Sequence, residues 1–245
     1  MAGIHGGSAL KRILITAFES FGEDSINPTQ EILKALPDVI STTATADAGT
    51  KRSENSFQIV KLLLPVSFNA APKMVLEAMK KLRPDAVISL GLAGGRAAVT
   101  PERVAINCMD ARIADNDGDA PCDQPVVECG TAAYFSTLPI KKIVAAVSEE
   151  GIPCSVSSSA GTYVCNALMY SVLHAAAQNS MKCALHIKTE GNGQAGDLCD
   201  RENRMLCGFI HVPYIESMGK KPFIKLEDEI RAVKAAVLVC AREIS

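Results

Sequence analysis

One cysteine lies where its sequence context could make it a nucleophile. Cys165 follows an apolar run at 152–157 and a turn of small residues at 158–162, and it lies in the first turn of a helix predicted over 163–177. The free N–H groups and the positive dipole end of a helix N-terminus favour thiolate over thiol. The chain has nine cysteines, and a buried cysteine is usually only a small apolar side chain. The position of Cys165 at the start of a predicted helix therefore distinguishes it from the other eight cysteines.

A thiolate nucleophile needs a base that carries its proton to the leaving group, and imidazole suits this role near neutral pH. The sequence has four histidines. His5 lies in a predicted tail, His174 lies within the helix after the nucleophile, and His186 lies in an apolar run predicted as a strand. His211 remains, near the end of a strand predicted over 207–212, and side chains there project to the edge of the sheet where ligands collect. A capping or packed histidine is the alternative interpretation of His211.

The third group would be an acid that fixes the imidazole tautomer and stabilises the imidazolium. Glu102, in the segment 100–105, is the candidate. The alternative interpretation is a strand-edge carboxylate that pairs with Arg103 or Arg96.

Motifs for metals and common cofactors are missing from the sequence. No two histidines lie three or four residues apart, so a compact zinc site is not expected. The acidic segment 115–119 resembles a calcium loop, but Val126 and Ala120 occupy two of its required positions, so a turn is predicted. Fingerprints for dinucleotides and for nucleotide phosphates are absent, as is the G-x-S-x-G elbow. We predict no metal and no cofactor.

Apolar runs alternate with helical patterns along the chain, which is typical of a mostly parallel sheet with helices on both faces. We predict an α/β fold, a three-layer α/β/α sandwich around a mostly parallel (mixed) twisted sheet, as a single domain over residues 1–245. The predicted strands are 12–16, 57–64, 86–90, 103–108, 152–157, 183–187 and 207–212, and the predicted helices are 28–36, 70–82, 140–148, 163–177 and 230–244. Residues 1–11 are predicted to be a flexible tail, and 41–55 and 188–204 to be surface insertions.

Composition excludes several classes of protein. With 48% hydrophobic and 21% charged residues over 245 positions, the chain is globular rather than disordered, collagenous or coiled-coil. A net charge of -2 gives no excess positive potential for nucleic acid. The uncharged stretch 151–181 is too polar in its middle to span a membrane. The lack of an apolar leader in the first eleven residues and the odd number of cysteines without a C-x-x-C pair indicate a reduced, cytoplasmic protein.

Four blocks of the sequence together resemble the pyroglutamyl peptidase I family of cysteine peptidases. They are 18–22 with 26–28, 91–107 around Glu102, 156–166 around Cys165, and 208–214 around His211, and they occur in family order. The resemblance implies that Cys165 is the nucleophile, that His211 is the general base and acid, and that Glu102 orients it. It implies removal of N-terminal pyroglutamate from peptides by thiolate attack and a thioester acyl-enzyme.

The resemblance also implies a substrate pocket with aromatic walls, formed by Phe18, Phe21 and Tyr163 around the lactam ring. Pyroglutamate has no free amine, so an apolar slot with one or two backbone hydrogen bonds suits it. The family usually has Phe at position 163, and it has Gly and Pro where this chain has Ala17 and Ser20. Affinity for the substrate could therefore differ.

Three further residues complete the implied pocket. Asn27 would lie near the ring, the backbone carbonyl of Leu92 would accept the lactam N–H, and Arg112 would assist the developing negative charge. The implied partners are N-terminally pyroglutamylated peptides, and a homo-oligomer is compatible with the sequence. Two alternatives stay open: a cysteine hydrolase of another small amide or acyl substrate, and a non-catalytic lactam-binding relative.

Overall fold

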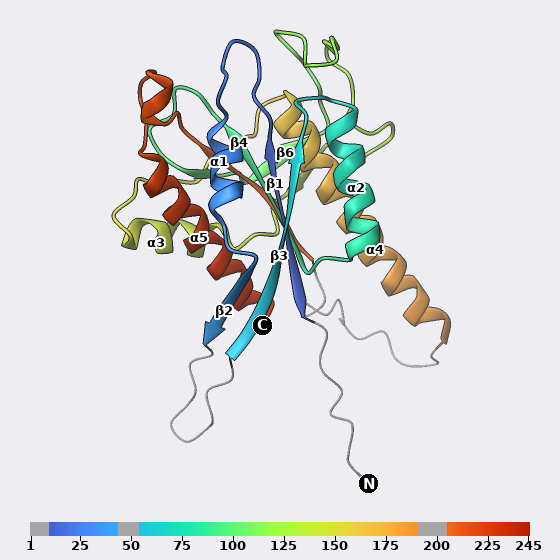
Figure 1. The fold of residues 1–245 in the computed structure, drawn as a ribbon. Coiled ribbons are helices and arrows are strands. Elements are labelled where there is room, and N and C mark those ends of the chain that lie inside the picture. Colours follow the sequence, from blue (N-terminus) through green and yellow to red (C-terminus); the bar gives the residue numbers. More distant parts are fainter. Residues whose placement is uncertain (1–9, 44–53, 191–204) are drawn as a thin grey trace.

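The computed structural model describes residues 10–43, 54–190 and 205–245 (Figure 1). The strands are β1 (Lys11–Phe18), β2 (Val39–Thr43), β3 (Glu54–Leu64), β4 (Ala86–Leu92), β5 (Thr100–Pro101), β6 (Val104–Ile106), β7 (Ala133–Phe135) and β8 (Leu206–Val212). The helices are α1 (Pro28–Ala35), α2 (Ala70–Leu82), α3 (Ile140–Glu149), α4 (Val164–Glu190) and α5 (Leu226–Glu243), with a 3₁₀ turn, η2, at Glu216–Met218.

A mixed sheet forms the middle layer, with strand order β2-β3-β1-β4-β8-β5. The four inner strands are parallel, and the two edge strands, β2 and β5, run antiparallel to their neighbours. Strands β6 and β7 form a separate antiparallel pair. The carboxyl ends of β1, β3, β4 and β8 therefore meet at one edge of the sheet, where ligands collect in folds of this kind.

Helices cover both faces of the sheet, as predicted. Figure 1 shows α2 and α4 on one side and α1, α3 and α5 on the other. The two buried clusters of apolar side chains follow the same division. In β8, Phe209 faces the cluster that includes α4, whereas Ile210 faces the opposite cluster. His211, two residues after Phe209, therefore lies on the α4 side.

Local sequence explains where the first helix begins. Asn27 is the N-cap of α1, and its side-chain oxygen accepts the backbone N–H of Thr29. Pro28 occupies the first helical position, where a missing N–H costs nothing. This start agrees with the predicted helix 28–36, and it fixes the end of the loop that follows β1.

Two predicted strands are wrong. The segment 183–187 belongs to α4, which continues to Glu190, because a short apolar run fits a helix as well as a strand. The segment 152–157 makes only isolated bridges at Cys154 and Ser157 along the β5 edge. Pro153 in that segment has no N–H to extend a ladder.

The predicted tail and insertions lie largely outside the described residues. Of the range 41–55, residues 41–43 and 54–55 belong to β2 and β3 rather than to an excursion, and 44–53 are not described. Of the range 188–204, residues 188–190 end α4, and 191–204 are not described. The predicted tail 1–11 is described only from Leu10, and Lys11 already begins β1.

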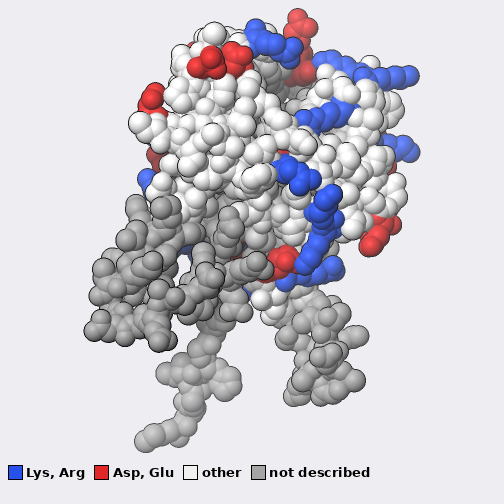
Figure 2. Space-filling model, turned by 180° about the vertical axis from the view of Figure 1, so that it is seen from behind, with Lys and Arg blue, Asp and Glu red and all other residues white. Residues whose placement is uncertain are grey.

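Charge on the back of the molecule is mixed. Figure 2 shows Lys and Arg mainly along one side, with Asp and Glu among them, beside a wide area of uncharged side chains. In the part of the chain that the structure describes, no helix combines the length and apolar character that crossing a bilayer requires.

Candidate active site

The nucleophile candidate lies over a glycine in the centre of the sheet. Cys165 is the second residue of α4. A β-carbon built on Gly91 would lie 3.1 Å from the Sγ of Cys165, so the thiol rests against the end of β4. In the register of β4 and β8, Gly91 is the partner of His211. The thiol therefore lies beside the strand pair that carries the histidine, on the same face of the sheet.

A buried carboxylate holds the imidazole. The Nδ1 atom of His211 is 2.7 Å from Oε1 of Glu102, and the two residues are 4% and 0% exposed. Glu102 directly follows β5, and its backbone N–H donates to the carbonyl of Phe209 at 2.9 Å. Since Nδ1 is engaged, the other ring nitrogen, Nε2, is left for the reacting group.

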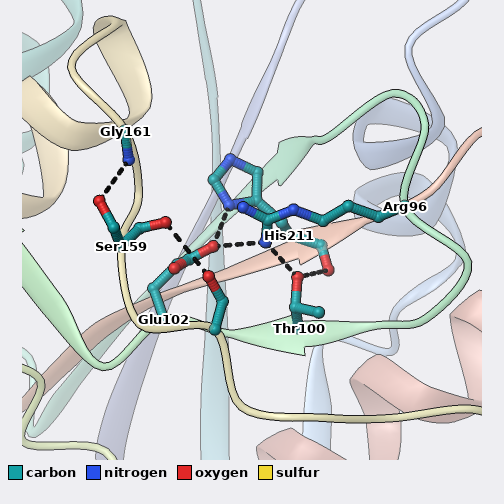
Figure 3. A network of polar contacts seen from close by, with 7 residues as sticks. Arg96, Thr100, Glu102, Ser159, Gly161 and His211 are labelled. Atoms are coloured by element: carbon teal, nitrogen blue, oxygen red, sulfur yellow. Dashed lines mark hydrogen bonds and ion pairs between the residues drawn. The ribbon is translucent and has the colours of Figure 1, made fainter.

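Glu102 pairs with an arginine as well as with the histidine. Nη1 of Arg96 lies 2.6 Å from the same Oε1 atom, so the two interpretations of Glu102 from sequence are combined in one carboxylate. Figure 3 shows both contacts converging on Glu102, with Thr100 below the guanidinium.

The resting thiol and imidazole are both neutral near pH 7. Burial raises the pKa of the Cys165 thiol to about 12, and the charge of Glu102 adds to this, against Arg96 and the backbone N–H of Cys165 itself. Burial lowers the pKa of His211 despite its bond to Glu102. The backbone N–H at the helix start favours the thiolate, as expected, but desolvation has the larger effect on the pKa of the resting thiol.

The acid stays ionised at neutral pH. Burial alone would raise the pKa of Glu102, but its interaction with His211, with smaller contributions from hydrogen bonds to Ser157 and Arg96, holds it below its usual value. A carboxylate rather than a carboxylic acid therefore faces the imidazole, as an orienting group requires.

The start of α4 is clamped to β6 by one buried amide. The Asn166 side-chain oxygen accepts the N–H of Ile106 at 2.9 Å, and its Nδ2 donates to the carbonyls of Ile106 and Cys108 at 2.9 Å each. The preceding turn is tight, with Gly161 at φ +80°. Its N–H donates to the hydroxyl of Ser159, as Figure 3 shows. These contacts fix the position of Cys165.

A pocket opens beside the thiol at the carboxyl edge of the sheet. It is lined by Phe18, Phe21, Asp24, Ile26, Asn27, Val66, Leu92, Tyr163, Val164 and Cys165. The structure thus brings together five of the six residues that the resemblance implied for substrate binding. The sixth, Arg112, is exposed and is not among the lining residues.

Aromatic side chains form one wall of this pocket. The ring of Tyr163 packs edge-on against Phe68, with centroids 5.1 Å apart, and lies 5.7 Å from Phe21. The Tyr163 hydroxyl donates to the carbonyl of Ala114 at 3.2 Å, so the group that the usual Phe lacks has a partner. Burial raises the pKa of Tyr163 to about 12, which keeps the phenol neutral.

Asn27 braces the loop that follows β1. Its Nδ2 donates to the carbonyl of Glu19 at 2.9 Å, while its Oδ1 caps α1 at Thr29. Both ends of the amide are engaged within the protein, so Asn27 shapes the pocket as well as lining it.

Sequence reasoning missed four lining residues, namely Asp24, Ile26, Val66 and Val164. Ile26 and Asp24 belong to the loop after β1, and Val66 follows β3. Their positions after the ends of strands could have indicated that they lie near the pocket. Asp24 also bonds Lys220 at 2.6 Å, a partner distant in sequence that no local pattern indicates.

The acidic segment 115–119 forms a turn, as predicted. The buried carboxylate of Asp115 accepts the backbone N–H groups of Phe68, Asp117 and Asp119 at 2.8–2.9 Å. Across the described ranges, no group of three or more His, Cys, Asp or Glu side chains could hold a metal ion.

Comparisons with known proteins identify the family of this chain. The family profile for pyroglutamyl peptidase matches residues 11–188. The chain is 40% identical over 235 residues to pyrrolidone-carboxylate peptidase 1 of Caldanaerobacter subterraneus subsp. tengcongensis, covering 94% of this chain and 98% of that protein. It is 37% identical to pyrrolidone-carboxylate peptidase of Bacillus cereus, covering 94% and 93%.

Solved structures give the same assignment. A mutant pyrrolidone carboxyl peptidase from Pyrococcus furiosus matches with a TM-score of 0.76 at 35% identity, covering 96% of this chain and 100% of that one. Pyroglutamyl peptidase I of Bacillus amyloliquefaciens matches with a TM-score of 0.74 at 34% identity, covering 95% and 97%. This chain therefore belongs to the pyroglutamyl peptidase family of cysteine-type omega peptidases, whose known activity is the removal of N-terminal pyroglutamate.

Proposed function

We propose that Cys165, His211 and Glu102 form the catalytic triad with which this chain removes pyroglutamate from the N-terminus of peptides. The observation that carries the proposal is the buried 2.7 Å contact between His211 Nδ1 and Glu102 Oε1, on the sheet face where the Cys165 thiol lines a small aromatic pocket. An acid, an imidazole and a thiol in this order are the parts of a nucleophilic acyl transfer.

In the first step, Nε2 of His211 takes the proton from Cys165 as Sγ attacks the pyroglutamyl carbonyl. The carbonyl π electrons move to oxygen, and backbone N–H groups at the start of α4 stabilise the oxyanion. The C–N bond then breaks, the imidazolium gives its proton to the leaving amine, and a thioester remains.

The second half-reaction uses water. His211 removes a proton from water as its oxygen attacks the thioester, the C–S bond breaks, and the thiolate of Cys165 takes the proton back from the imidazolium. Pyroglutamate is released and the neutral pair is restored, which is the resting state of the free site. Glu102 stays ionised throughout and orients the imidazole.

The pocket supports the lactam as the group that is bound. Phe18, Phe21 and Tyr163 present apolar surface to the ring, and the carbonyl of Leu92 at the end of β4 is proposed to accept the lactam N–H. Asp24, the carboxylate that lines the pocket, is paired with Lys220. It is therefore already neutralised and does not make the pocket a site for a free amine.

A fluorogenic pyroglutamyl amide tests the proposal, assayed under reducing conditions beside prolyl and alanyl amides. We expect only the pyroglutamyl amide to turn over, Cys165→Ser and Cys165→Ala to be inactive, and the matched Cys129→Ser, at an exposed cysteine, to retain activity. Activity in Cys165→Ala would show that the nucleophile is misassigned. Turnover of another amide alone would favour a different acyl specificity.

We also propose a cytoplasmic location. The proposed nucleophile, Cys165, acts only as a reduced thiol, which suits a reducing compartment. A homo-oligomer stays a prediction of the sequence, to be measured by light scattering.

A further inference from the structure

Both nitrogen partners of Glu102 bind the same oxygen. His211 Nδ1 and Arg96 Nη1 lie 2.7 Å and 2.6 Å from Oε1 of Glu102. Oε2 is buried and, among the described residues, has no hydrogen-bond partner. Besides His211 and Arg96, the Ser157 hydroxyl is the polar side chain that acts on this carboxylate, so removal of the arginine would leave it with fewer groups that fix its orientation.

The arginine is itself held in place by the strand opposite the histidine. Its Nη1 also donates to Oγ1 of Thr100 at 2.5 Å. Thr100 is the register partner of His211 across β5 and β8. The guanidinium thus spans the strand edge from Thr100 to Glu102, as Figure 3 shows, and its position depends on the same two strands as the imidazole.

We propose that Arg96 is a positioning residue of this site, which fixes the Glu102 carboxylate so that Oε1 faces His211 and adds a permanent positive charge beside the imidazole. The inference rests on the proposed function and deepens it. Arg96 is not among the residues that line the pocket, and its hydrogen bonds go to Thr100 and Glu102, so it acts through Glu102 and through its charge.

The charge has a defined direction of effect on the reacting groups. Glu102 and Arg96 are the charged groups that act on both His211 and Cys165, and Tyr163 is the titratable neighbour of the thiol at the start of α4. Arg96 lowers the pKa of His211 and that of Cys165. It therefore disfavours imidazolium in the free enzyme, where a neutral base is needed, and it favours removal of the thiol proton.

The test replaces Arg96 with Met and with Lys and follows His211 by NMR. The imidazole Cε1–H resonances of the four histidines are titrated, and His211 is assigned with a His211→Asn variant. In Arg96→Met we expect the midpoint of His211 to move up by about 0.5–1 pH unit, because loss of the positive charge outweighs the weaker hold on Glu102, whose contact raises the pKa of His211. Arg96→Lys, which keeps the charge, should move it much less.

Activity provides the second measurement. In Arg96→Met, kcat/KM for the pyroglutamyl amide should fall about 10- to 100-fold, with its acid limb moved upward with the His211 midpoint. Arg103→Met is the matched control, since it removes the same charge one residue after Glu102. It should change neither the midpoint nor the acid limb.

Several results would overturn the inference. They are an unchanged or lowered His211 midpoint in Arg96→Met, an equal upward shift in Arg96→Lys, or a fall in rate with no change in the acid limb. Thr100→Val removes one anchor of the guanidinium and keeps its charge. It serves if Arg96→Met does not fold, and it should also move the titration midpoint of His211 upward. Because the NMR titration needs no substrate, it tests Arg96 even if pyroglutamyl amides are not cleaved.

Discussion

Gly91 leaves the space in which the Sγ of Cys165 lies. A β-carbon at this position would be 3.1 Å from that sulfur and 2.7 Å from the ring of Phe209, which is fully buried. The glycine is also the register partner of His211. Cys165, the strand that carries His211 and the ring of Phe209 therefore all approach the chain at Gly91. Close approach, rather than an unusual φ angle, requires glycine here.

Gly91→Ala should therefore damage the site more than the fold. We expect about 1–3 kcal/mol of lost stability from overpacking against Phe209, and a fall in kcat of at least about tenfold, because the thiol is displaced from the imidazole. Gly130→Ala is the matched control, since its β-carbon would lie 2.5 Å from the Tyr170 hydroxyl, outside the pocket lining. Equal loss of kcat in both variants, at equal stability, would contradict the role of Gly91.

The sequence was enough to predict the strands and the helix that carry Cys165 and His211. Strands β1, β4 and β8 are buried on both faces and read as apolar runs, which made them recognisable. The N-terminus of α4 was visible as a turn of small residues before a helical pattern. Because parallel strands share one carboxyl edge, the placing of Cys165 and His211 followed from these elements alone.

Contacts made by loops were beyond the same reasoning. Arg96 and Arg103 were equivalent partners for Glu102 in sequence, and only the path of the loop after β4 brings Arg96 to the carboxylate. The desolvation that raises the pKa of the Cys165 thiol was not visible in the sequence for a related reason, because it depends on the packing of distant segments.

The amide of Asn166 should prove essential to the position of the nucleophile. In Asn166→Asp, a carboxylate oxygen would replace the donor that faces the carbonyls of Ile106 and Cys108. We expect about 2–4 kcal/mol of destabilisation from the lost bonds and the repulsion, together with a lower kcat in the fraction that stays folded. Urea denaturation and active-site titration with a thiol reagent measure the two effects.

Asn107 offers a matched control for that variant. Its side chain makes a similar bridge, accepting the N–H of Val127 at 2.9 Å and donating to the carbonyl of the same residue at 2.9 Å. Asn107→Asp should destabilise the protein to a similar degree while leaving the kcat of the folded enzyme near that of the parent. If Asn166→Asp kept full kcat, the clamp would be structural only.

The hydroxyl of Tyr163 should matter more for stability than for catalysis. Tyr163→Phe removes one hydrogen bond, to the carbonyl of Ala114, and keeps the ring contacts with Phe21 and Phe68. We expect about 0.5–1.5 kcal/mol of lost stability and little change in KM. Tyr163→Ala, which removes the wall, should raise KM strongly with a smaller effect on kcat. A large KM change in Tyr163→Phe would instead place the hydroxyl in contact with substrate.

Glu229 should make stability depend on pH far from the active site. This residue of α5 is fully buried, and both of its carboxylate oxygens lack hydrogen-bond partners among the described residues. Burial, with a contribution from the charge of Glu216, raises the pKa of Glu229 to about 9. The folded protein therefore holds a proton on Glu229 at neutral pH that the unfolded chain has released.

The sign of the effect follows from this difference in bound protons. Between the unfolded pKa, about 4.3, and the folded pKa near 9, the unfolded state binds fewer protons. Glu229 thus lowers stability by up to about 1.4 kcal/mol for each unit that the pH rises.

Glu229→Gln keeps the shape of the side chain and cannot ionise, so the stability of this variant relative to the parent should rise steadily from pH 5 to pH 9. Urea unfolding at several pH values measures the difference, with Glu227→Gln, at an exposed position of the same helix turn, as the control. A difference that stays constant with pH in Glu229→Gln would mean that the carboxylate is solvated or paired in the folded protein.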